Sequence, residues 1–419
     1  MTTGNSNKTL REMPLTWRRH LGVWAVSLSA ALTGVTASAN VEDQAKRIHD
    51  RLTGAYPSEA ILQQMVTLIE DDGNGIRAAE LAIDNNENHS FYNVTLKNWA
   101  APWTNREGDV FADLNDYIAT AIGFVRDERD FRGLLYQDVL YVGNAAGLPP
   151  YSSSNNSHYV ALEEGLELNG DPGYSLKDDL EARTQSQLVP ALANGGASGV
   201  ITSRAGAKAF LIAGTNRAAF RFTMVNHLCL DMEAVHDVTR VPDRIRQDVS
   251  RSPGGDSRIF LNNCMGCHTG MDPMAQAMAY HGYAYEPEND PTGENGQVEY
   301  TPGTVQEKYF NNDTTFPYGF RTPDNKWANY WRAGKNVVLG WDSALPGSGT
   351  GISTMFQELA HSEAYAQCHV KRVFRTVCLR NPQDATDRTE VSSLVSDFKN
   401  NGFNLKRTFA RAADYCMGE

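Results

Sequence analysis

Two cysteines three residues apart, with a histidine directly after the second, form the most distinctive chemical pattern in this sequence. They are Cys264, Cys267 and His268, in the stretch Cys-Met-Gly-Cys-His. This is the spacing of a c-type haem attachment site. On one turn of helix, two thiols so spaced can each bond a haem vinyl group, and the adjacent histidine can supply the proximal nitrogen to the iron. The sequence therefore predicts one covalent haem c on these residues.

Two other interpretations of the cysteine pair are weaker. A thioredoxin-like disulfide is expected in a βαβ context, and the flanking sequence has no such pattern. A structural zinc site needs a second ligand pair at close spacing, and the next cysteine after Cys267 is Cys368, about a hundred residues on. His227 and His236, which flank Cys229 on a helical segment, are interpreted as hydrogen-bonded structural histidines rather than as a second metal site.

The residue on the far side of the iron decides what such a haem can do. A methionine there gives a high-potential electron carrier, a second histidine lowers the potential, and an open position lets small molecules bind. Met355 is the predicted distal ligand, because it follows a long aromatic loop at the expected start of a helix. His281 and His361 are the alternatives.

The N-terminus has the layout of a secretory signal peptide. Four basic residues, Lys8, Arg11, Arg18 and Arg19, precede the apolar run 21–35, and cleavage is expected after Ala39. Covalent haem attachment takes place outside the bacterial cytoplasm, which agrees with this leader. We therefore expect an exported protein of the periplasm or cell surface.

The other four cysteines suit an oxidising compartment. They are Cys229, Cys368, Cys378 and Cys416. Cys368 and Cys378 are expected on one straight helix, too far apart to bond each other. A bond from either of them to Cys416, across two antiparallel helices, is favoured, and the sequence does not choose between the pairings.

The overall charge limits the choice of partner. The chain of 419 residues has 38 Lys and Arg against 50 Asp and Glu; without the leader these become 34 and 49, a net charge of −15. Such a surface repels nucleic acid and anionic lipid. No internal stretch approaches the length of a membrane span. The expected partner is therefore an unidentified redox protein, with no nucleic acid and no membrane span after signal cleavage.

Hydrophobic spacing predicts a mainly α fold that positions the motif. Apolar stripes at helical spacing are Ile61, Met65, Leu68 and Ile69 after a start at Ser58; Val110, Leu114, Tyr117, Ile118, Ala121, Ile122 and Val125; Val391, Leu394, Val395 and Phe398; and Leu405, Phe409 and Ala413. The stretch 147–158 has the composition of a loop, and 286–351 that of a long aromatic loop packed over something. Asp272-Pro273 is expected to end the attachment helix.

The flanks of the motif also resemble a known family. Met271-Asp272-Pro273-Met274 and Ala277 are similar to the motif of the cytochrome-c-like domain of large exported bacterial proteins, most abundant in planctomycetes. This sequence departs from the family motif at Ala275, where that family has glycine. Outside the motif, the segments 131–143, 198–228 and 356–380 are also similar to proteins of that family. The resemblance implies a multi-helical N-terminal region followed by a helical haem domain; the family's activity is largely unassigned.

Together these observations predict the domain organisation and the function. The expected parts are the signal peptide 1–39, an N-terminal helical domain 40–150, a linker and helical segment 151–250, and a cytochrome-c-like haem domain with C-terminal helices 251–419. The expected function is one-electron transfer through haem c outside the cytoplasm. The alternatives are a peroxidase-like or oxidase-like haem enzyme with an open distal site, and a surface binding protein with structural haem. Whether the protein is an enzyme stays open.

Overall fold

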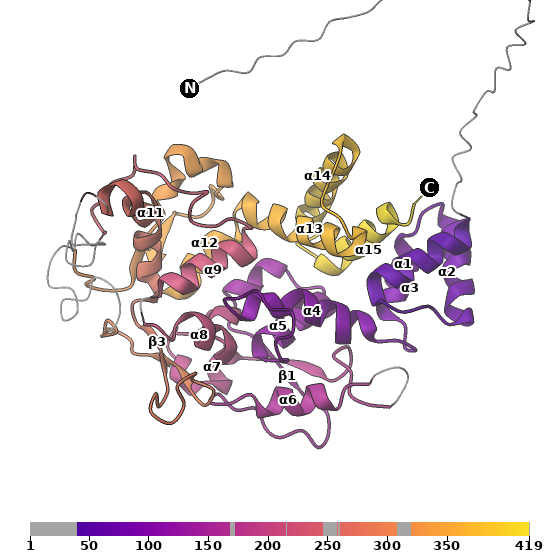
Figure 1. Ribbon diagram of the computed structural model, residues 1–419, viewed down its shortest axis with the longest axis horizontal. Helices are drawn as coiled ribbons and strands as arrows, with labels where there is room; N and C mark the ends of the chain where they lie inside the picture. Colours follow the sequence, from indigo (N-terminus) through magenta and orange to yellow (C-terminus); the bar gives the residue numbers. More distant parts are fainter. Residues whose placement is uncertain are drawn as a thin grey trace, which may run out of the picture. The chain divides into compact units, whose positions relative to one another are not determined.

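The computed structural model describes residues 40–167, 172–214, 216–245, 258, 260–307 and 320–418. The expected signal peptide, 1–39, lies outside the described residues. The described chain is mainly helical, with short strands that form three antiparallel pairs, β1–β2, β3–β4 and β5–β6. The mainly α fold class predicted from the sequence is thus confirmed (Figure 1).

The elements are as follows. The α-helices are α1 (Val41–Thr53), α2 (Glu59–Asp72), α3 (Ile76–Asp84), α4 (Lys97–Ala100), α5 (Asp116–Arg126), α6 (Ser157–Glu164), α7 (Gln185–Leu188), α8 (Arg204–Phe210), α9 (Arg217–His227), α11 (Met265–Ala275), α12 (Ile352–Ala360), α13 (Glu363–Cys378), α14 (Ala385–Asn400) and α15 (Leu405–Cys416). The strands are β1 (Leu140–Gly143), β2 (Leu180–Arg183), β3 (His281–Ala284), β4 (Gln297–Tyr300), β5 (Lys326–Ala328) and β6 (Ser348–Thr350). Short 3-10 or π-helical turns are η1 (Phe91–Leu96), η2 (Ala101–Thr104), η3 (Phe131–Leu135), η4 (Pro190–Leu192), η5 (Gly199–Thr202), η8 (Phe260–Cys264), η9 (Gln276–Met278), η10 (Tyr330–Arg332) and η11 (Gly334–Leu339).

Helix α2 begins where its sequence predicts. The side chain of Ser58 accepts a hydrogen bond from the Ile61 amide, which caps the helix, and Gly73 ends it in the left-handed conformation at φ 66°. Ile61, Met65 and Ile69 are buried on one face. This face packs against α1 and α3.

Helix α5 is shorter than its apolar pattern predicts. It begins after Asn115, whose Oδ1 accepts hydrogen bonds at 3.1 Å from the amides of Tyr117 and Ile118. Val110 and Leu114, expected on the same helix, therefore lie before it, and Val110 is 43% exposed. The residues of α5 up to Val125 are buried on every side, so α5 is a central helix rather than an amphipathic one.

The C-terminal helices pack against the N-terminal ones. Helices α14 and α15 cover the stripes predicted for them, and α15 lies against α13, α3 and α1 (Figure 1). Strand β1 pairs with β2 in the next part of the sequence, and α11 packs on α9. The three expected segments 40–150, 151–250 and 251–419 therefore contact one another through several elements.

The aromatic stretch 286–351 contains short elements of its own. Its described part includes β4, β5, β6, η10 and η11, while 308–319 lies outside the described residues. Trp331 is fully buried and Trp327 is 3% exposed, so these rings belong to the core. Trp341 Nε1 donates a 2.9 Å hydrogen bond to the Trp331 carbonyl, which joins two parts of the stretch. The expectation that the loop packs over something is met by Trp331, which lies against α11.

Candidate functional site

The cysteine–histidine motif opens helix α11. Cys264 stands at the end of the π-helical turn η8, and Cys267 and His268 follow in the first turn of α11. The helix continues through Pro273 to Ala275, so the expectation that Asp272-Pro273 ends it is wrong. The two thiols and the imidazole nevertheless lie on one helical turn, as the attachment chemistry requires.

The two motif cysteines are free thiols, in contrast to the other four. Both are half-buried, and the Cys267 thiol donates a hydrogen bond to the Met232 carbonyl, with 3.3 Å between sulfur and oxygen. Burial, with the neighbouring Cys264, raises the pKa of the Cys267 thiol. The raised pKa favours the protonated form of the Cys267 thiol, whereas the thiolate is the form that attacks a disulfide.

The remaining cysteines form two disulfides. Cys229 bonds Cys368, and Cys378 bonds Cys416, with Cα atoms 5.3 Å and 5.4 Å apart. The second is a bridge from α13 to α15, one of the pairings that the sequence left open. Within the described parts of the chain, no group of three or more Cys, His, Asp or Glu side chains could hold a metal ion.

His268 is held by a buried carboxylate one helical turn further on. Its Nδ1 lies 3.0 Å from Asp272 Oδ1 and 3.1 Å from Asp272 Oδ2. Arg217 Nη2, at the start of α9, lies 3.3 Å from Asp272 Oδ2. Burial alone would raise the pKa of Asp272, but the charges of Arg217 and His268 and their hydrogen bonds lower it, which keeps the carboxylate ionised.

The segment that follows α9 forms one wall of the site. The Asp237 amide donates to the Gly266 carbonyl at 2.8 Å, and Thr269 Oγ1 donates to the Asp237 carbonyl at 3.0 Å. The ring of His236 lies beside Gly266. Helix α11 is therefore fixed by its buried face, while Cys264, Cys267 and His268 keep partial exposure.

These residues fit a covalently attached haem. The thiols are free, so both sulfurs can form thioethers, and their half-buried positions leave access for attachment. His268 is 17% exposed and its Nδ1 is turned to Asp272, so Nε2 would be the nitrogen that binds the iron of such a haem. Sequence reasoning missed Asp272 as the partner of His268, and Arg217 as the partner of Asp272. The i, i+4 spacing of His268 and Asp272 was a usable signal, whereas no local pattern points to Arg217.

The predicted distal ligands have different surroundings. Met355 is fully buried in α12. His281, in β3, has Nε2 2.9 Å from the Gly196 carbonyl, and burial lowers its pKa to about 4. His361 has Nδ1 3.3 Å from Asp342 Oδ2 and Nε2 3.5 Å from the Tyr136 hydroxyl. Each histidine thus has a ring nitrogen engaged by protein groups, and the distal assignment stays a prediction.

His227 belongs to a buried aromatic cluster rather than to a metal site. The Tyr117 hydroxyl lies 2.7 Å from His227 Nε2, and His227 Nδ1 lies 3.3 Å from His369 Nε2. Burial, reinforced by the charge of Arg372, lowers the pKa of His227 to about 3, so the ring stays neutral. This agrees with its interpretation as a hydrogen-bonded structural histidine.

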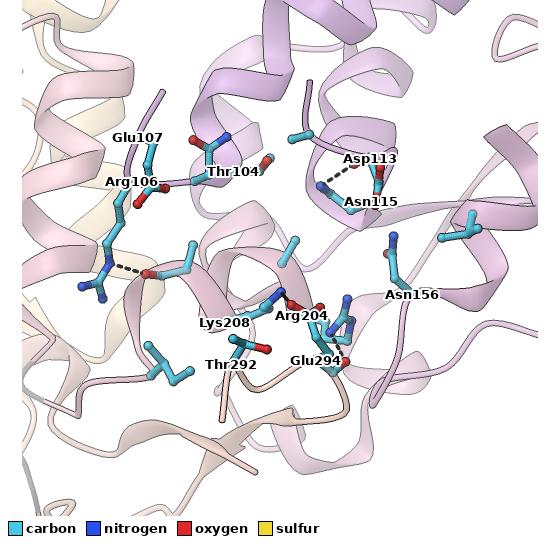
Figure 2. A pocket seen from close by; sticks show the side chains of 16 residues that line it. Thr104, Arg106, Glu107, Asp113, Asn115, Asn156, Arg204, Lys208, Thr292 and Glu294 are labelled. Carbon is cyan, nitrogen blue, oxygen red and sulfur yellow. Dashed lines mark hydrogen bonds and ion pairs between the residues drawn. The ribbon is translucent and has the colours of Figure 1, made fainter. Parts of the chain in front are cut away.

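A cavity bordered by charged side chains lies away from the motif. It has a volume of about 660 Å³ and is lined by residues of α8, by the stretch before α5 and by Glu294 (Figure 2). Lys208 forms an ion pair with the Glu294 side chain, Arg204 Nη1 donates to the Glu294 carbonyl at 3.1 Å, and Arg106 Nε donates to the Ala209 carbonyl at 2.7 Å. Positive and negative groups balance, so the cavity shows no preference for one sign of ligand.

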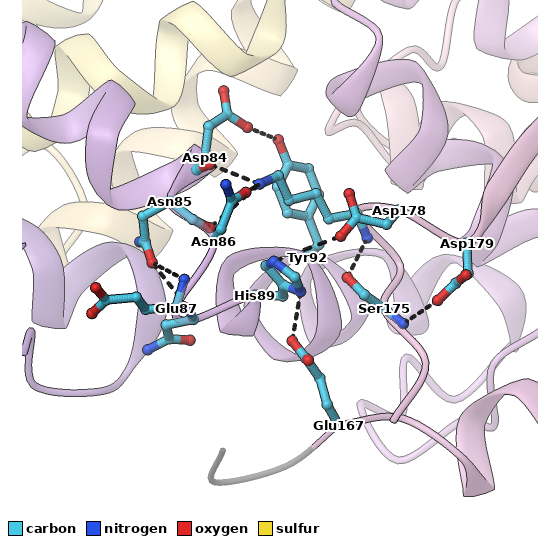
Figure 3. Close-up of polar contacts among 12 residues, drawn as sticks. Asp84, Asn85, Asn86, Glu87, His89, Tyr92, Glu167, Ser175, Asp178 and Asp179 are labelled. Atoms are coloured by element: carbon cyan, nitrogen blue, oxygen red, sulfur yellow. Dashed lines mark hydrogen bonds and ion pairs between the residues drawn. The ribbon is translucent and has the colours of Figure 1, made fainter. Parts of the chain in front are cut away.

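A second cavity, of about 400 Å³, lies beside His89. Figure 3 shows this ring between two carboxylates: Nδ1 is 2.5 Å from Glu167 Oε1, and Nε2 is 3.7 Å from Asp178 Oδ2. Nearby, the Tyr92 hydroxyl donates to Asp84 Oδ1 at 2.6 Å. These contacts tie the turn after α3 to the stretch before β2, which is a structural role.

Comparison of the chain with protein-family models, with curated proteins and with solved structures finds no match. The motif and its geometry are therefore the features of the chain that bear on its function. Of the helices that the structure describes, none combines the length and the apolar character needed to cross a bilayer.

Proposed function

We propose that the protein is an exported c-type cytochrome that transfers single electrons outside the cytoplasm. Cys264 and Cys267 would hold one haem c through thioether bonds, and His268 would be its proximal iron ligand. One observation carries this proposal: the free thiols of Cys264 and Cys267 lie on the same helical turn as His268, and Nδ1 of that histidine is already hydrogen-bonded to Asp272. When bound, the haem supplies a one-electron iron couple.

The protein's own residues have defined parts in this function. Asp272 fixes the orientation of the His268 ring, and the wall that includes Met232 and Asp237 fixes the helix beneath it. The cytochrome-c-like character of 251–419 belongs to the same proposal. The two disulfides and the signal-like N-terminus support a periplasmic or cell-surface location. The acidic surface supports a redox partner protein with a basic docking face.

A haem enzyme with an open distal position is the second candidate function. It is favoured by the protein contacts of His281 and His361, because a ring nitrogen that is already hydrogen-bonded must leave its partner to bind iron. The third possibility, a surface binding protein with structural haem, has no specific observation in its favour.

An absorption spectrum of protein matured in a host with haem-attachment machinery tests the proposal. It is recorded oxidised, reduced, and reduced with carbon monoxide. A c-type reduced spectrum that carbon monoxide leaves unchanged supports electron transfer, and Met355→Ala should then make the iron accessible. A marked shift with carbon monoxide favours the enzyme. Absence of covalent haem overturns the proposal.

A matched pair of double variants makes this test specific. Cys264→Ala/Cys267→Ala should abolish covalent haem, because both thioether sulfurs are lost. Cys378→Ala/Cys416→Ala removes as many sulfurs from the α13–α15 bridge and should keep the haem. Equal haem content in the two variants would contradict the assignment of the attachment site.

A further inference from the structure

The proximal histidine of the proposed haem contacts a charge that water cannot screen. The Asp272 side chain is 0% exposed, and both of its oxygens lie within 3.1 Å of His268 Nδ1. Both groups are on α11, so one turn of a rigid helix sets their separation. Partners that hold the second nitrogen of a metal-bound histidine fix the ring and strengthen it as a donor.

We infer that Asp272 is a positioning residue that strengthens His268 as an iron ligand and lowers the potential of the site. This inference rests on the proposed function. An imidazole N–H that donates to an anion is more electron-rich at its other nitrogen than one that donates to a neutral carbonyl. An electron-rich ligand, and a negative charge nearby in a medium of low dielectric constant, both favour ferric over ferrous iron.

Arg217 acts on the same carboxylate with the opposite sign. Its Nη2 lies 3.3 Å from Asp272 Oδ2, so it draws negative charge away from one of the two oxygens that contact His268. Because Arg217 belongs to α9, the strength of His268 as a ligand depends on the packing of α9 against α11. The structure thus contains two side chains that should shift the potential in opposite directions.

A lowered potential affects the direction in which the protein passes electrons. A site whose ferric state is stabilised gives up its electron readily. Whatever the distal ligand, the carboxylate of Asp272 then makes the protein a better electron donor, and a poorer electron acceptor, than it would be without that charge.

Asp237 supplies a matched control. The Asp237 side chain is 4% exposed and forms an ion pair with Arg240, with 3.3 Å between Arg240 Nε and Asp237 Oδ2. The residue lies against α11. It hydrogen-bonds Thr239. Asp237→Asn therefore removes a buried charge beside the same helix, whereas Asp272→Asn removes the charge in contact with His268.

The test measures the midpoint potential of the purified, haem-loaded variants, with covalent haem counted by intact mass. Asp272→Asn should shift the ferric–ferrous equilibrium about tenfold toward ferrous, ~59 mV upward for a one-electron couple. Arg217→Gln should shift the potential downward, and Asp237→Asn should shift it by less than half as much as Asp272→Asn.

Three outcomes separate the inference from the proposed function. Wild-type protein without covalent haem overturns the proposed function. A haem-loaded Asp272→Asn whose potential equals that of wild type or of Asp237→Asn overturns the inference alone. If Asp272→Asn does not fold, Arg217→Gln decides, because the Arg217 side chain is 28% exposed whereas that of Asp272 is fully buried. A downward shift supports the inference, and no shift or an upward shift overturns it.

Discussion

Helix α11 lies so close to its neighbour that one added methyl group should disturb it. A Cβ atom placed on Gly270 would lie 1.8 Å from Trp331 Nε1 and 2.1 Å from its Cε2. The Trp331 side chain is fully buried, so the ring has no solvent to move into. Ordinary van der Waals contact begins at about 3.4 Å, and the ring must therefore retreat by well over an ångström.

The magnitude follows from two opposing terms. Replacing a glycine in a helix interior by alanine stabilises the helix by roughly 1 kcal/mol. Overpacking a rigid core costs about 1–3 kcal/mol or more, and this overlap belongs at the upper end. Gly270→Ala should therefore lower the free energy of unfolding by roughly 2 kcal/mol.

Gly266 provides the control on the same helix. Its Cβ would meet the His236 ring at 2.3 Å, but His236 is only half-buried and can rotate toward solvent. Gly266→Ala gains the same helical preference without the trapped ring, so its stability should stay close to that of wild type. Urea unfolding followed by circular dichroism gives both values. The packing argument is refuted if Gly270→Ala is as stable as Gly266→Ala.

Three further predictions concern stability. The Cys229–Cys368 disulfide closes a loop of 139 residues and should add roughly 5 kcal/mol to the free energy of unfolding, whereas Cys378–Cys416 closes 38 residues and should add roughly 4 kcal/mol. In urea unfolding, Cys229→Ala/Cys368→Ala should therefore lose more stability than Cys378→Ala/Cys416→Ala. Burial lowers the pKa of several histidines below its usual value, among them the fully buried His227, His281 and His369. These rings are neutral in the folded state and become charged on unfolding, so the free energy of unfolding should fall as pH decreases from about 6.5 toward 4, whereas a flat profile would contradict their burial. Glu358→Ala should cost about 1.5–3 kcal/mol, because it removes the buried carboxylate that lies 2.8 Å from the Arg332 guanidinium, which is 25% exposed and keeps its hydrogen bond to the Asp342 carbonyl. Glu363→Ala breaks an exposed pair with Lys399 and should cost less than about 1 kcal/mol.

Helices with one polar face were predictable from the sequence, because their apolar residues recur at the helical spacing and so mark where the helix runs. The start of α2 at Ser58 and the last helix, which buries Leu405 and Phe409, follow from residues within a few turns. Helix α5 shows where this reasoning fails. It is buried on all sides, so its apolar pattern contains no boundary, and the cap at Asn115 decides where it begins.

The chemical part of the candidate site was predictable, and its surroundings were not. Cys264, Cys267 and His268 are neighbours in the sequence, so spacing alone brings them together. The helix passes through Pro273 because the packed elements around it hold a backbone that local preference would end. Arg217 reaches Asp272 across 55 residues of sequence, and such a pairing has no local signature.

The disulfide at Cys229 joins the proposed haem site to the C-terminal helices. Cys229 follows α9 directly, in the left-handed conformation at φ 57°, and it bonds Cys368 in the middle of α13. The segment that starts there forms the wall that accepts the Cys267 thiol hydrogen bond and contacts Gly266. One end of this wall is therefore fixed covalently, and α9, whose first residue pairs with Asp272, ends at the same point. The geometry around His268 thus depends on an oxidised bond outside the motif, which gives the C-terminal helices a part in shaping the site.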